Sequence, residues 1–460
     1  MSDNDRRLDE EEKAARSPGL SWDELAAADS RTVPVFLMRD ESRYLGSTPL
    51  STDRYTSPEF FQREIERMWP RVWQFAAREE ELPATGDVVV YENAGRSYLL
   101  TRQADGTVRA FHNVCLHRGR KLRTANGNVN EFKCPYHAFT WNTDGSLKNI
   151  PCKWDFKHLE GESMQLPEAQ VGRWGGFIFI KEEEGGPSLE EFLAPLPEHF
   201  ARWEPQNRVT TAWAAKVVPA NWKAAAEAFM EAFHVIATHP QIMAFTGDAN
   251  SKYNLYGDNV NLAITPFGVP SPHLDGDDFD QQEVMNAFLK YNGRVVPQNT
   301  TITVPDGSSA REVMGDFNRK RFGELAGRDF DHASDAEVQD ALTYNVFPNF
   351  SPWGGFSPAV VYRWRPWPDQ DHTLMEVRIL GFVPENGPEP KVASMRLLEP
   401  DEPWAAALGV LGSILDQDMG NLPHVQAGMK ASKNKTLHLG NYQESRIRHF
   451  HQTLDKYLDT

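Results

Sequence analysis

The chain contains 460 residues, of which 40% are hydrophobic and 25% charged, and it carries a formal net charge of −17. This length predicts two or three domains, and the acidity argues against a general nucleic-acid-binding protein. No apolar secretory signal and no apolar run of about 18 residues is present, and three cysteines do not make a disulfide framework. We therefore expect a cytoplasmic protein that interacts with neither membranes nor nucleic acids.

The first part of the chain predicts a polar arm followed by a small β domain. Residues 1–45 are charged and lack apolar periodicity, which indicates a flexible arm that can wrap a neighbouring subunit. Residues 57–69 predict a short amphipathic helix with Ser57 as N-cap and Pro58 at its first position. The acidic stretch 182–186 is predicted to be a linker. Between the helix and the linker lie β-rich runs separated by turn residues, at 87–91, 97–100, 108–111 and 176–180.

Two Cys-His pairs within this β domain form the most informative motif of the chain. Cys115 and His117 are separated by one residue, and Cys134 and His137 by two residues, so neighbouring loops offer two thiols and two imidazoles. A Rieske-type [2Fe–2S] cluster requires this set, with two cysteines on one iron and two histidines on the other. A structural zinc site is the alternative, but zinc fingers group cysteines together and histidines together. The mixed pairs therefore favour the cluster, and Gly119 suits the tight turn of the first loop.

Four basic residues stand beside the first of these loops. They are a candidate surface for an acidic electron donor, and a solvated loop is the equally weighted alternative. The residues are Arg118, Arg120, Lys121 and Arg123.

The remaining chain, from about residue 187, predicts a second domain that mixes strands with longer helices. The runs 360–364 and 374–380 are β-rich and are joined by a short polar segment, which suggests an antiparallel hairpin. Residues 246–330 are rich in Gly, Asp and Asn and show few periodic elements. A stretch of this kind is often a substrate lid, with disorder as the alternative.

The alanine-rich segment 221–240 carries a second candidate site. Its composition predicts a helix, on which Glu227, Glu231 and His234 share one face because they stand at i, i+4 and i+7. His239 would lie off that face on an ideal helix. The proline that follows disfavours helical geometry at His239, and a distorted helix end could turn this side chain back towards His234.

Two histidines and one carboxylate in a facial arrangement bind non-haem Fe(II) and leave positions open for O₂ and substrate. The residues leave the carboxylate undecided. Glu227 and Glu231 belong to the same segment, whereas Asp416 and Asp418 follow the run 404–415, which has the length of a buried core helix. The alternative is one core histidine and one surface histidine. The cluster motif favours the iron site, because an electron-transferring cluster needs a consumer of electrons.

With both motifs, residues 45–455 closely resemble the α (oxygenase) subunits of Rieske non-haem iron aromatic-ring-hydroxylating oxygenases. The resemblance implies an α+β protein with an N-terminal all-β Rieske [2Fe–2S] domain and a C-terminal catalytic domain of helix-grip type, in which an antiparallel sheet wraps a long helix. The expected division is an arm over 1–45, the Rieske domain with its preceding helix over 46–185, and the mononuclear-iron domain over 186–460.

The resemblance also implies roles for single residues. His234 and His239 match the iron histidines of the family. Asp418 matches the carboxylate ligand, because Asp418 and Gln426 reproduce the spacing that follows that ligand, and Asp416 is the rival.

A third acidic residue is implied to connect the two metal centres. Glu231 matches the acid that bridges the catalytic site to a Rieske histidine of the neighbouring subunit in a head-to-tail trimer, and His137 matches that histidine. Asn221 also matches the family, in a mainly structural role. The chain departs from the common pattern in having Glu231 where many members have Asp, and Ala228 where many have Asn.

The function that the resemblance implies is that of a terminal oxygenase. Electrons from NAD(P)H would arrive through a separate reductase, with or without a ferredoxin, because the chain has no Gly-rich dinucleotide fingerprint of its own. With O₂ the enzyme would hydroxylate an aromatic or polycyclic hydrophobic substrate, as a homotrimer with or without a β subunit. Oxidative N- or O-demethylation is the alternative within the class, and an electron carrier without oxygenase activity or a zinc hydrolase are the alternatives outside it. The expected pocket lining is Phe229, Met230, Phe233, Met243, Phe245, Phe350 and Phe356.

Overall fold

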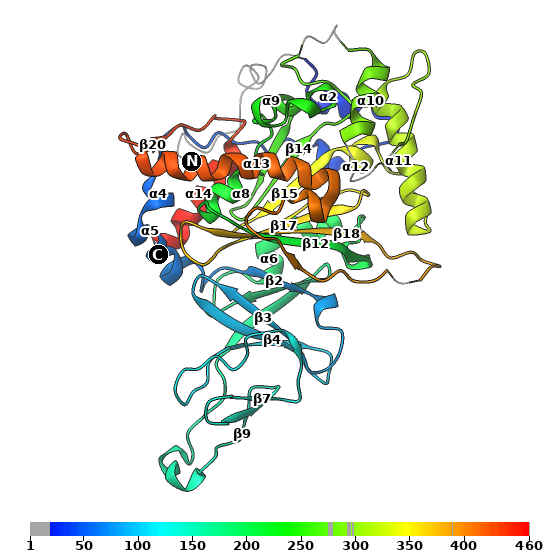
Figure 1. Cartoon of the computed structure of the whole chain (residues 1–460). Coiled ribbons are helices and arrows are strands. Elements are labelled where there is room, and N and C mark those ends of the chain that lie inside the picture. The colour runs from blue at the N-terminus through cyan, green and yellow to red at the C-terminus, as the bar shows by residue number, and fades with distance from the viewer. Residues whose placement is uncertain (1–18, 275–278, 292–295, 297–298, 389, 460) are drawn as a thin grey trace. The chain divides into compact units, whose positions relative to one another are not determined.

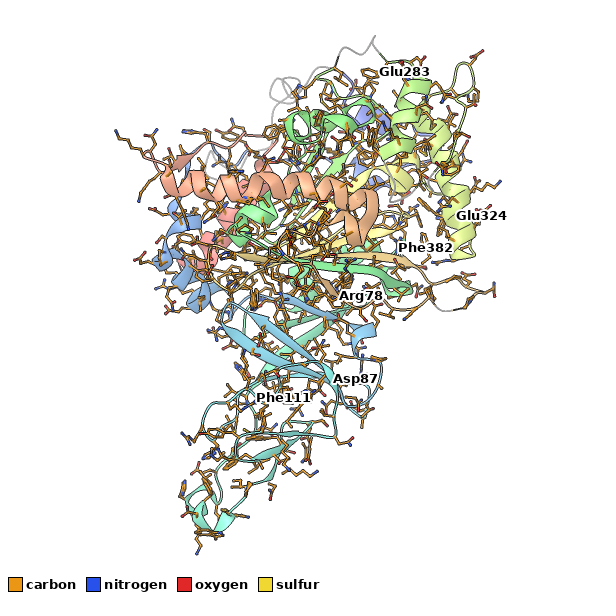
Figure 2. All side chains as sticks on the ribbon, viewed as in Figure 1. Arg78, Asp87, Phe111, Glu283, Glu324 and Phe382 are labelled. Carbon is orange, nitrogen blue, oxygen red and sulfur yellow. The ribbon has the colours of Figure 1, made fainter. Side chains whose placement is uncertain are left out.

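The computed structural model describes residues 19–274, 279–291, 296, 299–388 and 390–459 (Figure 1). The contacts divide the chain into two compact units. The smaller unit comprises residues 63–192, and the larger unit combines residues up to 62 with those from 193 onwards. The sequence placed these boundaries near residues 45 and 185. Each unit has its own sheets and its own core, and Figure 2 shows the side chains, with Phe111 buried in the smaller unit and Phe382 in the larger one.

The smaller unit is built from short antiparallel strands, as the β-rich runs predicted. Its main sheet has the order β2-β11-β10-β5-β4-β3-β6, and a second sheet has the order β7-β8-β9. The hairpin between β3 and β4 turns at Ala94 and Gly95, which both have positive φ. The strands are β2 (Gln74–Arg78), β3 (Asp87–Asn93), β4 (Arg96–Arg102), β5 (Val108–His112), β6 (Gly127–Asn128), β7 (Glu131–Lys133), β8 (Thr140–Asn142), β9 (Leu147–Asn149), β10 (Glu168–Trp174) and β11 (Phe177–Lys181).

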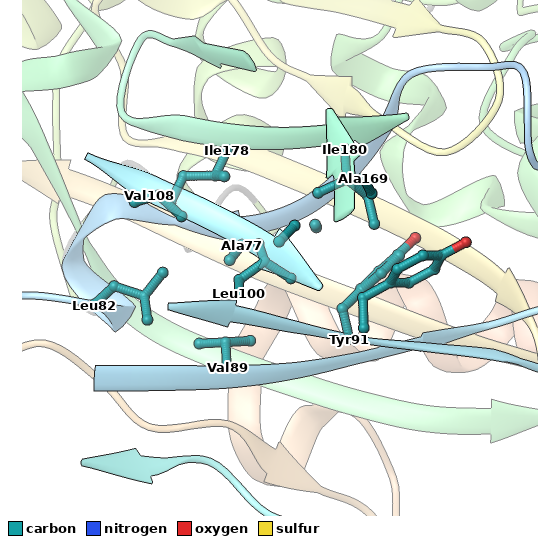
Figure 3. Close-up of a cluster of buried hydrophobic side chains, with 12 residues drawn as sticks. Ala77, Leu82, Val89, Tyr91, Leu100, Val108, Ala169, Ile178 and Ile180 are labelled. Carbon is teal, nitrogen blue, oxygen red and sulfur yellow. The ribbon is translucent and has the colours of Figure 1, made fainter. Parts of the chain in front are cut away.

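Two hydrophobic clusters hold the smaller unit together. In the first cluster, Tyr91, Leu100, Val108 and Ile178 pack with other buried apolar side chains (Figure 3). The second cluster contains both cysteines of the Cys-His motif together with Phe132, Phe139 and Trp141. The two metal-motif loops are therefore anchored by their cysteines in apolar surroundings.

The predicted helix over residues 57–69 is confirmed, with a change of winding near its middle. It begins after Ser57, whose Oγ accepts a hydrogen bond from Phe60 N at 3.2 Å. α5 (Pro58–Arg63) has α geometry, and residues Glu64–Met68 continue as a π-helix.

The larger unit contains two antiparallel sheets and most of the helices. One sheet has the order β16-β17-β18-β12-β19, and the other has the order β13-β14-β15. β17 and β18 form the predicted hairpin, with Tyr362 opposite Val377, and β19 alone runs parallel to its neighbour. The strands are β12 (Arg208–Val218), β13 (Lys252–Tyr256), β14 (Val260–Thr265), β15 (Ala341–Val346), β16 (Ser351–Pro352), β17 (Ala359–Pro366), β18 (Thr373–Phe382) and β19 (Arg396–Leu397).

The long helix α13 packs against β12, and in Figure 1 it runs across the unit in orange. An isolated two-stranded pair joins β1 (Leu50–Ser51) to β20 (Thr436–Leu437). This mixed unit and the all-β unit confirm the α+β class. Besides α5, the α-helices of the described residues are α2 (Trp22–Ala27), α3 (Val35–Met38), α4 (Asp53–Thr56), α6 (Leu189–Leu193), α7 (Leu196–Phe200), α8 (Trp222–Glu227), α9 (Val235–Thr238), α10 (Gln281–Tyr291), α11 (Ala310–Ala326), α12 (Asp335–Gln339), α13 (Ala405–Ala431) and α14 (Ser445–Leu458).

The expectation of a flexible arm over residues 1–45 is wrong for its described part. α2 begins with a capping box between Ser21 and Glu24, and Trp22 is 1% exposed. The indole Nε1 of Trp22 donates to Asp340 at 2.9 Å. This buried tryptophan helps to hold the segment in place although the sequence has no long apolar periodicity. Residues 1–18 lie outside the described residues.

The alternative of disorder over residues 246–330 is also wrong where the structure describes them, whereas the expectation of a substrate lid stays a prediction. β13 and β14 pair with each other, and β14 pairs with β15, so this part of the segment belongs to a sheet. α10 and α11 follow. Residues 275–278, 292–295, 297 and 298 lie outside the described residues. The strands escaped prediction because they are buried on both faces and show no alternation.

The predicted core helix 404–415 is longer and less buried than expected. α13 extends to Ala431, is interrupted by Gly409 with φ 59°, and buries only part of its surface. The backbone N–H groups of Trp404 and Ala405 donate to the carboxylate of Asp416 at 2.7 and 3.2 Å. The first turn of α13, before the kink at Gly409, therefore folds back on the rest of the helix, and the side chain of Asp416 caps that turn.

A buried ion cluster joins the N-terminal segment to α11. Arg311 Nη2 lies 2.9 Å from Asp29 Oδ1, and Arg311 Nη1 lies 2.6 Å from Asp340 Oδ1, with little exposure of any partner. We expect Arg311→Met to destabilise the larger unit by about 3–5 kcal/mol, because two buried carboxylates would lose their cation. Chemical denaturation measures this change. Arg31→Met is the control, since Arg31 pairs with the exposed Asp331 and should cost less than about 1 kcal/mol.

His449 on α14 makes the stability of the larger unit depend on pH. Its Nε2 donates to Gly257 O at 2.9 Å, and burial lowers the pKa of His449 to about 4. In the unfolded chain the same imidazole takes up a proton near pH 6.5. The contribution of neutral His449 to the free energy of unfolding is therefore complete above pH 6.5 and is lost as the pH falls towards 4. Between pH 7 and 4, the free energy of unfolding should fall by about 2–3 kcal/mol less in His449→Gln than in wild type. Parallel curves for the two proteins would contradict this assignment.

Candidate functional site

The two Cys-His loops share one backbone conformation. Cys115 N donates to the carbonyl oxygen five residues later at 2.8 Å, and Gly119 N donates back to Cys115 O at 2.9 Å. The loop of Cys134 repeats both hydrogen bonds at 2.8 and 3.0 Å, with Ala138 in place of the glycine. Gly119 and Ala138 have φ 74° and 57°, so both loops turn in the left-handed region.

The donor atoms of these loops are buried and suited to a metal cluster. The rings of His117 and His137 lie 4.6 Å apart, and the Nδ1 atom of each ring is buried without a hydrogen-bond partner. The Cys115 thiol contacts that of Cys134, and burial raises the pKa of Cys115. Unpaired buried nitrogens are costly, and coordination by a metal would satisfy both of them.

The arrangement of the same four donors does not suit zinc. Among the described residues, three or more donor atoms come within 4.8 Å of one another only at His234, His239 and Asp418. A tetrahedral zinc ion needs its four ligands around one point. Here the thiols are adjacent to each other and the imidazoles are adjacent to each other, which fits two separate irons.

The predicted continuous helix over 221–240 is wrong, because the segment breaks in its middle. α8 ends at Glu227, and α9 begins only at Val235. Glu231 lies in the connecting turn, where its Oε2 accepts a hydrogen bond from His234 N at 3.1 Å. The shared helix face expected from the i, i+4, i+7 spacing therefore does not exist. The expected end of the helix at His239 is confirmed, since its ψ of 50° is not helical.

The two histidines that flank α9 converge with one aspartate. His239 Nε2 lies 2.9 Å from Asp418 Oδ1, and His234 Nε2 lies 3.6 Å from the same oxygen. One ligand atom from each of the three residues lies within 4.8 Å of the others. Asp418 comes from α13, about 180 residues away along the chain. Two imidazoles and a carboxylate in this geometry suit non-haem Fe(II).

Glu227, one of the four carboxylates that the sequence left open, has other partners. Its oxygens accept hydrogen bonds from Tyr55 Oη at 3.0 and 2.9 Å, and its Oε1 lies 2.8 Å from His451 Nε2. All three side chains are largely buried. Glu227 therefore ties α4, α8 and α14 together and does not join the two histidines.

The structure separates the other acidic candidates as well. Asp416 caps the first turn of α13. Glu231 Oε1 lies 2.5 Å from His234 Nδ1, on the side of the ring away from Asp418. Burial opposes protonation of His234, but the hydrogen bond and charge of Glu231, with the charge of Asp418, raise the pKa of His234 above its ordinary value.

Asn221 has a structural role at the start of α8. Its side chain accepts a hydrogen bond from Lys223 N at 3.1 Å, and its own N–H donates to Gln426 Oε1 at 3.0 Å. Asn221 and Gln426 thus fix α8 against α13, the helix that carries Asp418.

A pocket opens beside the three converging residues. Phe229 and Phe245 line it as expected, whereas the other five residues of the predicted lining are not among those that line it. The sequence missed most of the lining because it comes from separate elements, and for Tyr362 the sequence predicted only a place in a β-rich run. The residues that it missed include Phe267, Tyr291, Trp353, Tyr362, Leu411, Ile414 and Leu415.

Comparison with known sequences identifies the class of protein. Residues 199–460 match the family described as ring hydroxylating alpha subunit (catalytic domain), and residues 72–160 match the Rieske [2Fe-2S] domain. The first match covers more than half of the chain, so the chain belongs to the ring-hydroxylating α subunits, in which a Rieske domain is joined to a non-haem iron catalytic domain. The protein is a Rieske oxygenase and thus an oxidoreductase.

Two curated relatives show the range of this family. The glycine betaine monooxygenase oxygenase subunit of Chromohalobacter salexigens is 31% identical over 312 residues, which cover 66% of this chain and 67% of the relative. The large oxygenase component of the naphthalene 1,2-dioxygenase system of Pseudomonas aeruginosa is 36% identical over 199 residues, which cover 39% of this chain and 42% of the relative. The family thus includes both an oxygenase named for a quaternary ammonium compound and one named for an aromatic hydrocarbon.

Solved structures show the same fold. The quaternary ammonium Rieske monooxygenase CntA in its apo form has a TM-score of 0.60 at 19% identity, over 89% of this chain and 96% of that chain. Naphthalene 1,2-dioxygenase with indole bound has a TM-score of 0.61 at 22% identity, over 90% of this chain and 92% of that chain. In the described part of the chain, helices that are both long enough and apolar enough to cross a membrane are absent.

Proposed function

We propose that Cys115, His117, Cys134 and His137 hold the Rieske cluster, with the thiolates on one iron and the imidazoles on the other. Three observations support these ligands. The rings of the two histidines lie 4.6 Å apart with buried, unpaired Nδ1 atoms, the thiols are in contact, and the two loops share one conformation. Backbone N–H groups of His117 and Arg118 also point at the Cys115 sulfur and favour its thiolate.

His234, His239 and Asp418 are the ligands that we propose for the mononuclear iron. Their convergence supports this assignment. When bound, ferrous iron with open coordination positions supplies the activation of O₂ beside the substrate. Glu231 holds the His234 ring through Nδ1, which leaves Nε2 directed towards Asp418. The family resemblance implies a further contact, in which Glu231 meets His137 of a neighbouring subunit in a trimer.

The reaction that the pocket favours is hydroxylation of an aromatic or polycyclic substrate. The observation that carries this proposal is the lining, which places aromatic and aliphatic side chains from several separate segments of the unit directly beside the converging residues. Phe229, Trp353 and Tyr362 can stack on or against a flat ring system. Leu411 and Leu415 of α13 add apolar surface that excludes water from the reacting carbon.

Oxidative demethylation of a quaternary ammonium compound is the second candidate. The relatives named for glycine betaine and carnitine support it, and a ring of aromatic side chains can also bind a cation through its π-faces. The titratable groups that line this pocket are Glu231, Asp418 and the two histidines. For both reactions we infer a separate reductase, with or without a ferredoxin, as the source of electrons.

Product analysis with ¹⁸O₂ tests the reaction class. Reconstituted oxygenase and a reductase would be supplied with polycyclic aromatic compounds and, separately, with carnitine and glycine betaine. We expect the aromatic compounds to gain one or two heavy oxygens without loss of carbon. Formaldehyde release from the ammonium compounds, with no oxygenated aromatic product, would establish demethylation instead.

Iron counting tests the ligand assignments independently of the substrate. The loaded wild-type chain should contain three irons, two in the cluster and one alone. We expect His234→Ala to contain two irons, to keep the visible absorption of the cluster, and to lose product formation. Cys134→Ala should lose that absorption. His451→Ala serves as a control for a buried histidine near α8 and should keep all three irons. A chain that carries zinc at either centre would refute the corresponding assignment.

A further inference from the structure

His239 is held through both nitrogens of its ring by adjacent residues of α13. Its Nε2 lies 2.9 Å from Asp418 Oδ1, and its Nδ1 lies 2.9 Å from Gln417 Oε1. Gln417 contributes a neutral amide, whereas the Nδ1 of His234 meets the carboxylate of Glu231. The two histidines therefore have chemically different partners on the nitrogen that faces away from Asp418.

The amide of Gln417 is itself oriented by Gln241. Gln241 Nε2 donates to Gln417 Oε1 at 2.6 Å, and Gln417 Nε2 donates to Gln241 Oε1 at 3.3 Å. This reciprocal pair turns the oxygen of Gln417 towards His239, so that Oε1 is the acceptor at Nδ1. An imidazole that donates from Nδ1 keeps its lone pair on Nε2, the nitrogen beside Asp418.

We propose that Gln417 is a positioning residue for the mononuclear iron. It holds the His239 ring in the Nδ1–H tautomer and at the angle that directs Nε2 to the point shared with Asp418 and His234. This inference rests on the iron site proposed above. The partner of a metal-bound imidazole fixes the tautomer and the orientation of the ring, and its removal weakens the binding of the metal.

The neutrality of Gln417 also matters for the charge of the centre. Asp418 and Glu231 supply two carboxylates beside the histidines, which together balance a divalent cation. A glutamate at position 417 would keep the acceptor for His239 and add a third negative charge near an apolar pocket. Such a charge favours the bound cation and makes His239 a stronger donor.

Asn421 offers a matched control on the same helix. It lies one turn beyond Gln417, and its Nδ2 donates to Thr238 Oγ1 at 3.1 Å. Asn421 therefore joins α13 to the same neighbouring segment but touches none of the proposed ligands. Removal of the Asn421 side chain tests the docking of α13 alone, whereas removal of the Gln417 amide also frees the His239 ring.

The experiment is an anaerobic competition between the full chain, with its cluster intact, and a chelator for ferrous iron. We expect Gln417→Met to weaken iron binding roughly ten- to hundredfold, and Gln417→Glu to bind at least as tightly as wild type because the acceptor is kept. Asn421→Ala should stay within about threefold of wild type. With nitric oxide as a probe, the EPR spectrum of the ferrous site should change shape in Gln417→Met and keep the wild-type shape in Asn421→Ala.

Three results would overturn the positioning role. They are wild-type iron affinity in Gln417→Met, an equal loss of affinity in Asn421→Ala, and a loss in Gln417→Glu as large as that in Gln417→Met. Failure of the iron site itself gives a different result, because wild type would then bind no more ferrous iron than His234→Ala does.

Discussion

The catalytic unit depends on one constraint, the approach of Asp418 on α13 to two histidines that flank the short helix α9. His239 Nε2 and His234 Nε2 both face Asp418 Oδ1. An uninterrupted helix from Asn221 to His239 would have carried the two rings to different faces. His239 leaves helical geometry at the end of α9, with a ψ of 50°, which lets its ring turn towards Asp418. The side chain of Glu231 stabilises the turn between α8 and α9 by accepting a hydrogen bond from the backbone of His234.

Much of the surrounding structure serves to hold these two elements against each other. Asn221 and Gln426 join the start of α8 to α13, and Glu227 joins the end of α8 to Tyr55 and His451. These five residues are not among the described residues that line the pocket, so they can fix the backbone without occupying the space beside the histidines. The pocket is then left to apolar side chains, which lower the local polarity and strengthen the interaction of the carboxylates with a cation.

The smaller unit positions its cysteine and histidine donors through local structure. Each Cys-His loop closes on itself through two backbone hydrogen bonds, and its cysteine is anchored in a hydrophobic cluster. Few distant residues are needed to place these donors, since the spacing within each loop already sets the positions of its thiol and its imidazole. This explains why the short-range pattern of residues was a sufficient guide to the first centre and an insufficient one to the second.

The amino-acid sequence by itself identified the two groups of donors, the order of the two units, the β17–β18 hairpin and the helix that begins after Ser57, because each depends on neighbours within a few residues. Without the family resemblance, which pointed to Asp418, it could not choose among Glu227, Glu231, Asp416 and Asp418. It also did not reveal the break after α8, the packed segment around Trp22 or the aromatic lining from β17. Only the tertiary structure decided these, because alanine-rich helix propensity amounts to a few tenths of a kcal/mol per residue and is outweighed by buried hydrogen bonds and ion pairs between segments hundreds of residues apart.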